Sequence, residues 1–384
     1  MRDLSRSALN IADLRELARR RLSRGIFEYI DRGTEDEIGI AHNQQALKRI
    51  KLRPRVLHDV SRRSTEIDLF GKTRKLPLVI APTGTTGQVW YRGEVALARA
   101  AAKAGIPFTL SNAATAPLEE VIADGGGTPW FQLYVWTDRE ASYRAVARAE
   151  SAGYEALVVT VDNIIDPNRE FNIRNDFMQP FRLTPRNILD GLMSPRWLFG
   201  TVARHVLGGG LPKLVNVPTE VMESALGDAA LRLKSDAFDW DDLRRIRDMW
   251  PRPLIVKGIV HPDDARHAAD LGADGVVVSN HGGMVSDATM ATIDALPDIV
   301  SAVGDRMTVL VDSGFRRGSD VVKALALGAD AVMIGRATLY GTAAAGEAGA
   351  TRAIDILREE IRRVMGIIGC RDIGSIAPEH VVMP

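Results

Sequence analysis

The sequence predicts a (β/α)₈ barrel, and three observations lead to that fold class. First, a helix end is followed by glycine and a short apolar or β-branched run at Gly105, Gly153, Gly272 and Gly328; glycine takes the left-handed conformation that ends helices, and such short runs are strands. Second, further strands are expected at 77–81, 130–135, 254–257 and 308–311, which brings the number of buried strands to eight. Third, no G-x-G-x-x-G follows the first strand, which argues against the alternative of a doubly wound open sheet.

Helices are expected between these strands, and several begin with Asp or Ser at or near the cap position. Their ranges are 93–104, 139–152, 241–250, 263–271 and 318–327. Residues 1–24 are rich in arginine, place Ile11 and Leu14 at helical spacing, and lack the apolar stretch of a secretory signal, so they predict a surface helix of the mature protein. Residues 343–369 also have a helical pattern and are expected to close the bottom of the barrel or pack on the first helices.

The composition favours a single domain over residues 1–384 that acts on small molecules. With 49 basic and 49 acidic side chains, nothing in the net charge points to nucleic acid. Cys370 is the only cysteine, which excludes an internal disulfide and a cysteine metal site and suits the reducing cytoplasm. No apolar run reaches the ~18 residues that a membrane span needs, so the chain is expected to be soluble or at most peripheral.

A long insertion is expected after the fourth strand, at about residues 162–235, and connections of this length are usually functional. Within it, Trp197, Leu198, Val202 and Val206 fall near one face of a helical segment with arginines nearby. One interpretation is peripheral contact with the inner face of the membrane through residues 191–217. The other is a lid or an oligomer contact folded on the barrel.

Polar or glycine-rich residues follow all eight predicted strands. Because ligands of such barrels bind at the carboxyl ends of the strands, this collective pattern predicts a ligand site. In order along the chain, the strand ends read Pro82-Thr83-Gly84, Ser111-Asn112, Gln132 with Tyr134, Thr160 with Asp162, Lys257-Gly258, Ser279-Asn280-His281, Asp312-Ser313-Gly314 and Gly335-Arg336.

Three of these strand ends indicate particular chemistry. His281 is placed as a general base, and Asp312 on the neighbouring strand is expected to fix its tautomer. Lys257 supplies a positive charge that either stabilises an anionic ring or forms a Schiff base, which leaves an aldolase open as an alternative. The glycines and arginines of 312–318 and 335–336 are typical of a phosphate site. His261 and His267 are six residues apart, off one helical face, and we expect no metal.

Together these residues resemble the FMN-dependent α-hydroxy acid oxidases and dehydrogenases. The resemblance runs from about residue 14 to residue 378, and 59–64, 312–315 and 335–341 are most similar to its mandelate and lactate dehydrogenase branch. It implies an FMN cofactor, a homotetramer and oxidation of a mandelate- or lactate-like 2-hydroxy acid to the 2-keto acid. Its sharpest parts are Ser279-Asn280-His281-Gly282-Gly283, Phe131-Gln132-Leu133-Tyr134, 312–318 and 323–329.

The resemblance also implies a role for each site residue. His281 would be the base, Asp312 its partner and Lys257 the charge beside the flavin ring. Arg169 would hold the substrate carboxylate, while Tyr29 and Tyr134 would hydrogen-bond substrate. The flavin would lie against Pro82, Thr83 and Gly84, with its ring bonded by Ser111, Gln132 and Thr160, and its ribityl phosphate end held by Ser279, Asp312, Gly314, Arg316, Gly335 and Arg336.

Two positions refine the expected activity. Gly84 stands where many oxidases of the family carry alanine, which favours a dehydrogenase that passes electrons to a quinone or another carrier over one that uses oxygen. Met284 stands where the family carries a second arginine for the substrate carboxylate. The alternative is therefore an FMN oxidoreductase for a bulkier or non-carboxylate hydroxy or amine substrate. A barrel retained only as a binding scaffold is the non-enzyme alternative.

Overall fold

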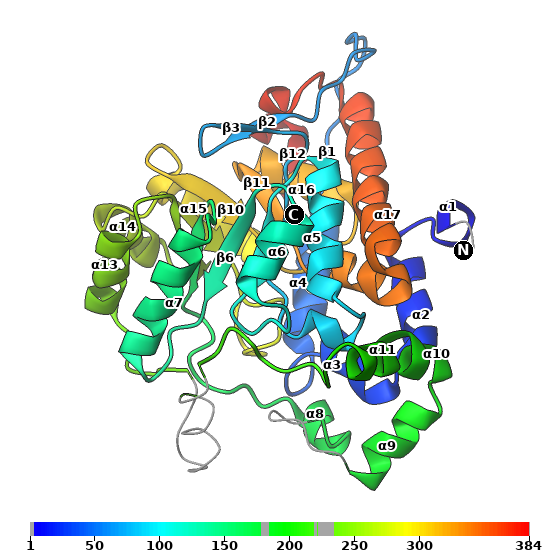
Figure 1. The fold of residues 1–384 in the computed structure, drawn as a ribbon. Helices are drawn as coiled ribbons and strands as arrows, with labels where there is room; N and C mark the ends of the chain where they lie inside the picture. Colours follow the sequence, from blue (N-terminus) through cyan, green and yellow to red (C-terminus); the bar gives the residue numbers. More distant parts are fainter. Residues whose placement is uncertain (1–3, 178–183, 219–220, 222–233, 384) are drawn as a thin grey trace.

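The computed structural model describes residues 4–177, 184–218, 221 and 234–383, and it contains a closed parallel barrel of eight strands, as predicted (Figure 1). Each strand pairs with the next along the chain, and the last pairs with the first, so the doubly wound alternative is wrong. The strands are β4 (Leu78–Ile80), β5 (Phe108–Ser111), β6 (Pro129–Leu133), β7 (Leu157–Thr160), β8 (Leu254–Ile259), β9 (Gly275–Val278), β10 (Thr308–Val311) and β11 (Ala331–Ile334).

Helices cover the outside of the barrel and alternate with its strands. All four glycines predicted to end helices have positive φ, at 69° for Gly105, 88° for Gly153, 92° for Gly272 and 97° for Gly328. The helices are α5 (Gly93–Ala104), α6 (Leu118–Gly125), α7 (Arg139–Ser151), α13 (Trp240–Met249), α14 (Pro262–Asp270), α15 (Thr292–Val303), α16 (Gly318–Ala326) and α17 (Arg336–Ile368).

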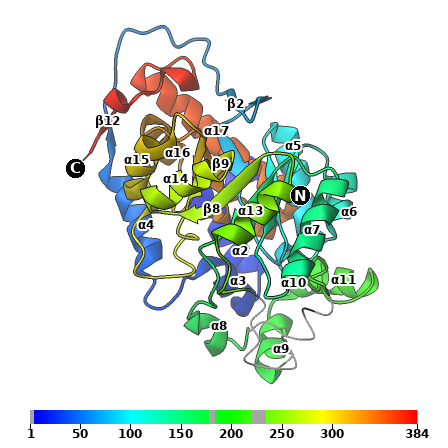
Figure 2. The ribbon, with the colours of Figure 1, turned by 90° about the vertical axis from the view of Figure 1, so that its left-hand side faces the viewer.

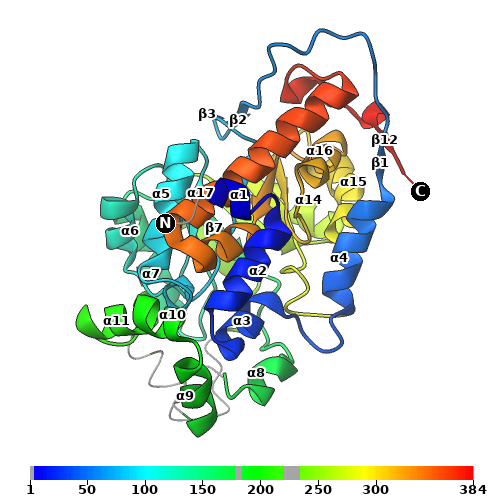
Figure 3. The same cartoon turned by 90° about the vertical axis from the view of Figure 1, so that its right-hand side faces the viewer.

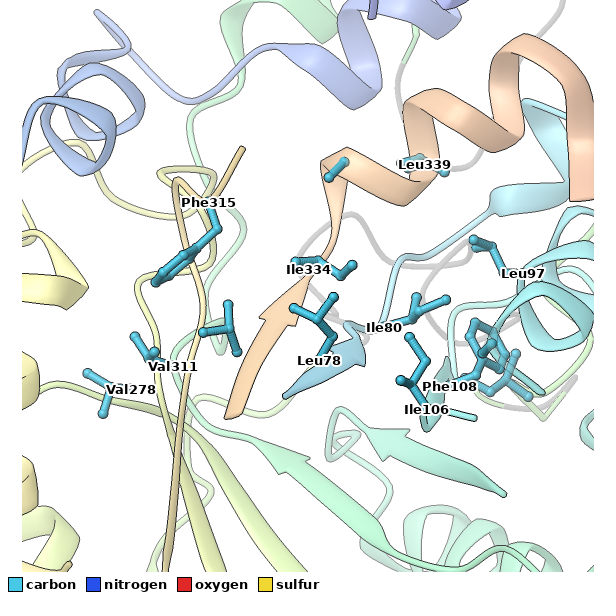
Figure 4. Close-up of a cluster of buried hydrophobic side chains, with 14 of the residues drawn as sticks. Leu78, Ile80, Leu97, Ile106, Phe108, Val278, Val311, Phe315, Ile334 and Leu339 are labelled. Atoms are coloured by element: carbon cyan, nitrogen blue, oxygen red, sulfur yellow. The ribbon is translucent and has the colours of Figure 1, made fainter. Parts of the chain in front are cut away.

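Alternate strand residues build two apolar layers. Leu78 and Ile80 belong to the layer between strands and helices, which Figure 4 shows, whereas Val79 belongs to the packed interior of the barrel. The interior ends at Phe70, in the hairpin of β2 (Ile67–Leu69) and β3 (Lys72–Arg74), whose ring contacts Trp130. The N-terminal end of the barrel is therefore plugged, and a ligand can enter only from the carboxyl ends of the strands.

The segments before β4 and after β11 pack together. The predicted N-terminal helix is α2 (Ile11–Arg21), which follows the short helix α1 (Leu4–Ser7). It lies along the C-terminal helix α17, which was expected to pack on the first helices (Figure 3). The sequence did not predict α3 (Arg24–Asp31), α4 (Ile38–Arg49) or the antiparallel pair of β1 (Lys51–Leu52) with β12 (Val381–Val382). The remaining short turns are η1 (Thr86–Gln88), η3 (Ile373–Ser375) and η4 (Pro378–His380).

The long connection between β7 and β8 contains helices at the carboxyl end of the barrel, opposite the β2–β3 hairpin (Figure 2). Part of the predicted 162–235 insertion lies outside the described residues. The described helices are α8 (Glu170–Arg174), α9 (Pro185–Leu192), α10 (Pro195–Trp197), the π-helix η2 (Leu198–Val202) and α11 (Ala203–Leu207). Within the described residues, no helix combines the length and the apolar character that crossing a membrane requires.

Candidate active site

His281 is mounted on a strained turn directly after β9. Its φ of 56° lies in the left-handed region that non-glycine residues rarely adopt, and Gly282 and Gly283 continue the turn at 66° and 69°. The hydroxyl of Ser279 accepts a hydrogen bond from the His281 backbone N–H at 3.1 Å. The turn holds the ring at the mouth of the barrel, which is where the sequence placed the base.

The imidazole of His281 lies between Asp162 and Tyr134. Asp162 Oδ1 is 3.0 Å from Nδ1, and the Tyr134 hydroxyl is 3.0 Å from Nε2. Burial opposes ionisation of Asp162, but the charges of His281 and Lys257 outweigh it and lower the pKa of Asp162. Because the ionised carboxylate accepts from Nδ1–H, neutral His281 keeps its lone pair on Nε2, where a base needs it.

The prediction that Asp312 is the partner of His281 is therefore wrong. Asp312 follows β10, beside β9, and its Oδ2 lies 3.2 Å from the Lys257 ammonium, while its Oδ1 accepts from Ser313 at 2.7 Å. The Ser313 hydroxyl in turn accepts from the Gly282 N–H at 2.9 Å. Asp312 thus supports the loop of His281 through Ser313 and neutralises Lys257, without contacting the imidazole.

Asp162 was visible in the sequence as a polar residue after β7, but its partner was not. It reaches His281 across β8 because Gly258 has no side chain: a Cβ at Gly258 would lie 2.6 Å from the Asp162 Cβ. Gly258 also has a φ of 110°, which favours glycine. In the sequence, Gly258 directly after Lys257 was the one signal that another side chain, here Asp162, could approach the backbone closely at this strand end.

Lys257 is held as an ammonium ion rather than as a free amine. Its side chain is only 3% exposed and donates to the Ser279 hydroxyl at 2.8 Å. Burial alone would lower the pKa of Lys257, but Asp312 and Asp162 outweigh it and raise the pKa. A Schiff base needs a neutral amine, so this environment does not support the aldolase alternative.

Replacing Lys257 with methionine is expected to destabilise the fold by about 3–5 kcal/mol, because it leaves the Asp312 carboxylate buried without its partner. Because folding raises the pKa of Lys257, its ammonium group stabilises the folded state. This stabilisation is complete below pH ~10.4 and is lost as the pH rises through the pKa of the folded state. Urea unfolding of wild type and K257M between pH 7 and pH 11 measures this difference.

Lys323 provides the control, because burial lowers its pKa and its ammonium donates to the Leu47 carbonyl. Because folding lowers the pKa of Lys323, protonation of its side chain as pH falls destabilises the folded state. The difference in free energy of unfolding between wild type and K323M should therefore change with pH in the opposite direction to that for K257M. Equal slopes for K257M and K323M would contradict this account of Lys257.

Three further predicted residues form one buried row of hydrogen bonds across neighbouring strands. Ser111 donates to Gln132 Oε1 at 2.9 Å, and Gln132 Nε2 donates to Thr160 Oγ1 at 2.9 Å. All three side chains are buried. The chain of donors and acceptors fixes the Gln132 amide, so the row presents a polar edge of defined orientation to a planar ligand.

The loop after β4 is tied to the residues that follow β5, since the Thr85 N–H donates to the Ala113 carbonyl at 2.8 Å. Pro82, Thr83 and Gly84 are partly exposed, and a Cβ at Gly84 would come no closer than 3.4 Å to Ala113. Thr83 is held at 3.1 Å from the Thr86 hydroxyl. The position therefore has room for alanine, and its glycine is not required by packing.

The predicted phosphate end lies where β10 and β11 finish. Gly314 has a φ of 90°, a conformation that favours glycine. Gly335 lies at the N-terminus of α17, and the nearest atoms to an added Cβ at Gly335 are 3.7 Å away or more, so its backbone is accessible to a ligand. The Arg316 guanidinium lies 5.9 Å from the centroid of the Tyr340 ring, and Arg336 lies one turn before Tyr340 at the start of α17. Two cations beside a helix N-terminus suit a phosphate.

Arg336 also has a role that the sequence did not indicate. Its guanidinium donates to three backbone carbonyls, those of Ile30 at 3.1 Å, Gly282 at 2.7 Å and Arg32 at 3.2 Å. Burial lowers its pKa to about 10. Three of its five N–H groups are thereby used, and two remain for an anion. Arg336 thus ties the end of α3 to the turn that carries His281.

Arg169 and Tyr29 form the outer wall of the site. The Arg169 guanidinium donates to the Tyr29 carbonyl and lies 4.8 Å from the centroid of its ring. Its Nε is buried and has no acceptor, and burial lowers its pKa. An enclosed donor without a partner is costly, so this atom is suited to a carboxylate supplied by a ligand. Met284 is partly buried and adds no charge.

Comparisons with known proteins identify the family of the chain. The model of the family described as FMN-dependent dehydrogenase matches residues 18–383. The chain is 42% identical to (S)-mandelate dehydrogenase of Pseudomonas putida, over 98% of this chain and 95% of the relative, and 44% identical to L-lactate dehydrogenase of Caulobacter vibrioides, over 95% of each. A crystal structure of the monotopic membrane protein (S)-mandelate dehydrogenase superposes with a TM-score of 0.92 at 41% identity, covering 98% of this chain and all of that one.

Proposed function

The chain belongs to the family of FMN-dependent dehydrogenases, and we propose that it oxidises a bulky, mandelate-like 2-hydroxy acid to the 2-keto acid. The observation that carries this proposal is the chain of hydrogen bonds from Asp162 through His281 to Tyr134, beside the unpartnered Nε of Arg169. A base whose lone pair faces only the exchangeable Tyr134 hydroxyl, and a guanidinium Nε that lacks an acceptor, are what a hydroxy acid requires.

FMN bound against the strand ends supplies the two-electron acceptor. The fixed row of Ser111, Gln132 and Thr160 suits its ring, and the open backbone of Gly335 suits its phosphate end. The charge of Lys257 is placed to stabilise negative charge on a ring beside it. These features support FMN, the cofactor of the family, as the ligand of the site.

The protein's own groups move the proton. His281 Nε2 accepts a proton from the substrate, and Asp162 stabilises the imidazolium that forms. The Tyr134 hydroxyl contacts Nε2 when no substrate is present, and it is placed to hydrogen-bond the substrate instead. Burial, with the charge of Asp162, raises the pKa of Tyr134, so its hydroxyl stays a donor at neutral pH.

Anaerobic mixing of the FMN enzyme with lactate, glycolate, mandelate and mandelate esters tests this proposal, with bleaching of the flavin absorption as the signal. We expect mandelate to bleach the flavin faster than the two small acids do. Bleaching by a neutral ester but by no acid would contradict the assignment of Arg169 to a carboxylate. Failure of every hydroxy compound would contradict the proposed activity.

Met284 is proposed to disfavour small acids, because it leaves Arg169 as the main charged contact for the carboxylate. Replacing Met284 with arginine is expected to raise kcat/KM for lactate about 10- to 100-fold, since a charge-assisted contact contributes about 1.5–3 kcal/mol. Steady-state kinetics with lactate and mandelate measure the change. Met383→Arg, at an exposed position near the end of the chain, is the control. Unchanged use of lactate by M284R would contradict this account of Met284.

The acceptor is proposed to be a quinone rather than oxygen, on the basis of Gly84. Alanine fits at this position without a clash, so the glycine is not there for steric reasons. After reduction by mandelate, reoxidation by a soluble quinone analogue should be faster than reoxidation by air. The reverse order would assign the chain to the oxidases of its family.

An exposed apolar surface favours peripheral contact with a membrane. Of the nineteen large apolar side chains exposed in the described part of the chain, nine lie between residues 188 and 215, and these nine, concentrated in one segment, are termed the patch. The helix face predicted from the sequence is only partly exposed, because Val206 is exposed whereas Trp197, Leu198 and Val202 are half-buried. Trp197 donates a hydrogen bond to the Gln88 carbonyl at 2.7 Å and packs on the core. The side chains of Leu192, Phe199 and Leu207 are exposed instead.

Replacing Leu192, Phe199 and Leu207 together with serine is expected to abolish cosedimentation of the enzyme with vesicles of phosphatidylethanolamine and phosphatidylglycerol. These three side chains are 61%, 69% and 88% exposed, so their removal should leave the fold intact. The matched control replaces Leu9, Val56 and Leu57, which are equally exposed but lie outside the patch. Equal vesicle binding by both triple variants would rule out a membrane contact through this surface.

A further inference from the structure

An open, strongly basic pocket of about 540 Å³ lies at the end of the barrel opposite the active site. Its charged lining consists of five cationic side chains and one carboxylate: Arg63, Lys75, Lys103, Arg358, Arg362 and Glu66. The whole chain carries no net charge, so this local excess is not a consequence of overall basicity. We propose that the pocket is a second ligand site, which binds a small soluble anion that carries several phosphate groups.

Most of the positive charge in the pocket is not compensated. Glu66 pairs with Lys75 at 2.7 Å, and Asp355, one turn earlier on α17, pairs with Arg358 at 2.7 Å. Among the residues that the structure describes, no carboxylate pairs with Arg63, Lys103 or Arg362. Like charges gathered in a concave surface repel one another, and a multivalent anion would remove that repulsion.

The arginines of the pocket are held in place before any ligand binds. Arg362 donates to the Arg63 carbonyl at 2.9 Å, and Arg63 donates to the Val60 carbonyl at 2.5 Å. The Arg63 guanidinium lies on Gly366 of α17, where a Cβ would be 3.2 Å from Nη1. Its Nε is enclosed and has no acceptor. Little side-chain entropy therefore remains to be lost when an anion binds.

The backbone around these side chains is also fixed. Ser64 N–H donates to the Arg371 carbonyl at 2.8 Å, Thr65 Oγ1 donates to the Lys75 carbonyl at 2.9 Å, and Lys75 N–H donates to the Gly105 carbonyl at 3.1 Å. These bonds join the segment before β2, the strand β3 and the end of α5 into one wall. The pocket is thus a built feature of the fold rather than a gap between mobile side chains.

Size and position decide the class of ligand. A volume of about 540 Å³ lies in the range of small-molecule sites, and paired arginines and lysines are typical of phosphate recognition. The pocket lies near the β2–β3 hairpin, whereas the exposed apolar helices α9 and α11 lie at the other end of the molecule (Figures 1 and 3). A protein resting on a bilayer through those helices would turn the pocket toward the aqueous phase. The ligand is therefore a dissolved anion and not a lipid headgroup.

Titration calorimetry of the FMN enzyme with tripolyphosphate, in buffer near physiological ionic strength, tests the proposal. Lys103→Gln with Arg358→Gln removes two cations whose loss breaks no contact between segments. The control, Lys48→Gln with Arg266→Gln, is matched: Lys48 and Lys103 each lie in the last turn of a helix, and Arg266 and Arg358 each pair with an aspartate three residues earlier.

We expect wild type and K48Q/R266Q to bind tripolyphosphate equally, and K103Q/R358Q to bind at least about tenfold more weakly. Orthophosphate should bind more weakly than tripolyphosphate. Absence of tripolyphosphate binding, or equal losses in both double variants, would overturn the proposal. Loss of vesicle binding by K103Q/R358Q would assign the pocket to a lipid headgroup instead, and a changed oligomeric mass with unchanged tripolyphosphate binding would make it an interface between copies of the chain.

Discussion

Replacing His281 with glutamine is expected to lower the rate of flavin reduction about 10²- to 10⁴-fold, with FMN still bound. Glutamine can occupy the turn after β9 and hydrogen-bond Tyr134, but its amide cannot accept a proton as Nε2 does. Anaerobic stopped-flow spectroscopy with mandelate measures the rate, and the flavin spectrum before mixing shows that cofactor is retained.

The control is His58→Gln, because His58 is exposed and lies in the segment before β2, beside Gly369 at the end of α17 and away from the site. It should reduce its flavin at the wild-type rate. A rate for H281Q within tenfold of wild type would mean that another group accepts the proton, and the assigned role of His281 would then be wrong.

Replacing Asp162 with asparagine is also expected to slow flavin reduction by about 10²- to 10⁴-fold, because the neutral amide neither fixes the Nδ1–H tautomer nor stabilises the imidazolium. Asp312→Asn provides the comparison. It removes the charge facing Lys257 and should lower FMN retention more than the rate per bound flavin. Measuring both quantities for both variants separates the two carboxylates.

Equal losses of rate per bound flavin in D162N and D312N would contradict the assignment of Asp162 as the carboxylate that acts on His281. The free energy of unfolding at low pH provides a second measurement. Because the pKa of Asp162 is lowered on folding, its carboxylate stabilises the fold above its usual pKa near 3.9, and this contribution is lost as pH falls through the lowered value. The D162N variant should lack this part of the acid transition.

The barrel was predictable because its signals are local. Glycines such as Gly105 and Gly272 end helices through their own backbone freedom, and the apolar runs behind them form strands whatever their neighbours are. The polar strand ends followed from the same pattern, so the residues of the site could be named. Which carboxylate contacts His281 could not be predicted, because that depends on where the side chains point. Strand adjacency indicated Asp312. The left-handed turn at His281 and the absence of a side chain at Gly258 instead place the imidazole against Asp162.

The exposed face of the insertion illustrates a second limit. An α-helical wheel assumes one repeat throughout, but residues 198–202 form a π-helix, whose wider turn rotates the side chains that follow it. Trp197 and Val206 are nine residues apart, about two and a half α-helical turns, so they lie on opposite sides even of a regular helix, and Trp197 is turned to the Gln88 carbonyl. The hairpin that places Phe70 under the barrel was missed for a different reason, since its two strands have three residues each and no clear alternation.

The carbonyls that Arg336 joins belong to segments far apart in the sequence, Ile30 and Arg32 in one and Gly282 in the other. Ile30 and Arg32 leave the ribosome early, whereas β11 and Arg336 follow some three hundred residues later. During synthesis, the wall of the substrate site that α3 provides has no anchor until the last strand has emerged and closed the barrel. The nascent chain therefore cannot hold α3 against the turn of His281 until β11 has paired with β10 and β4.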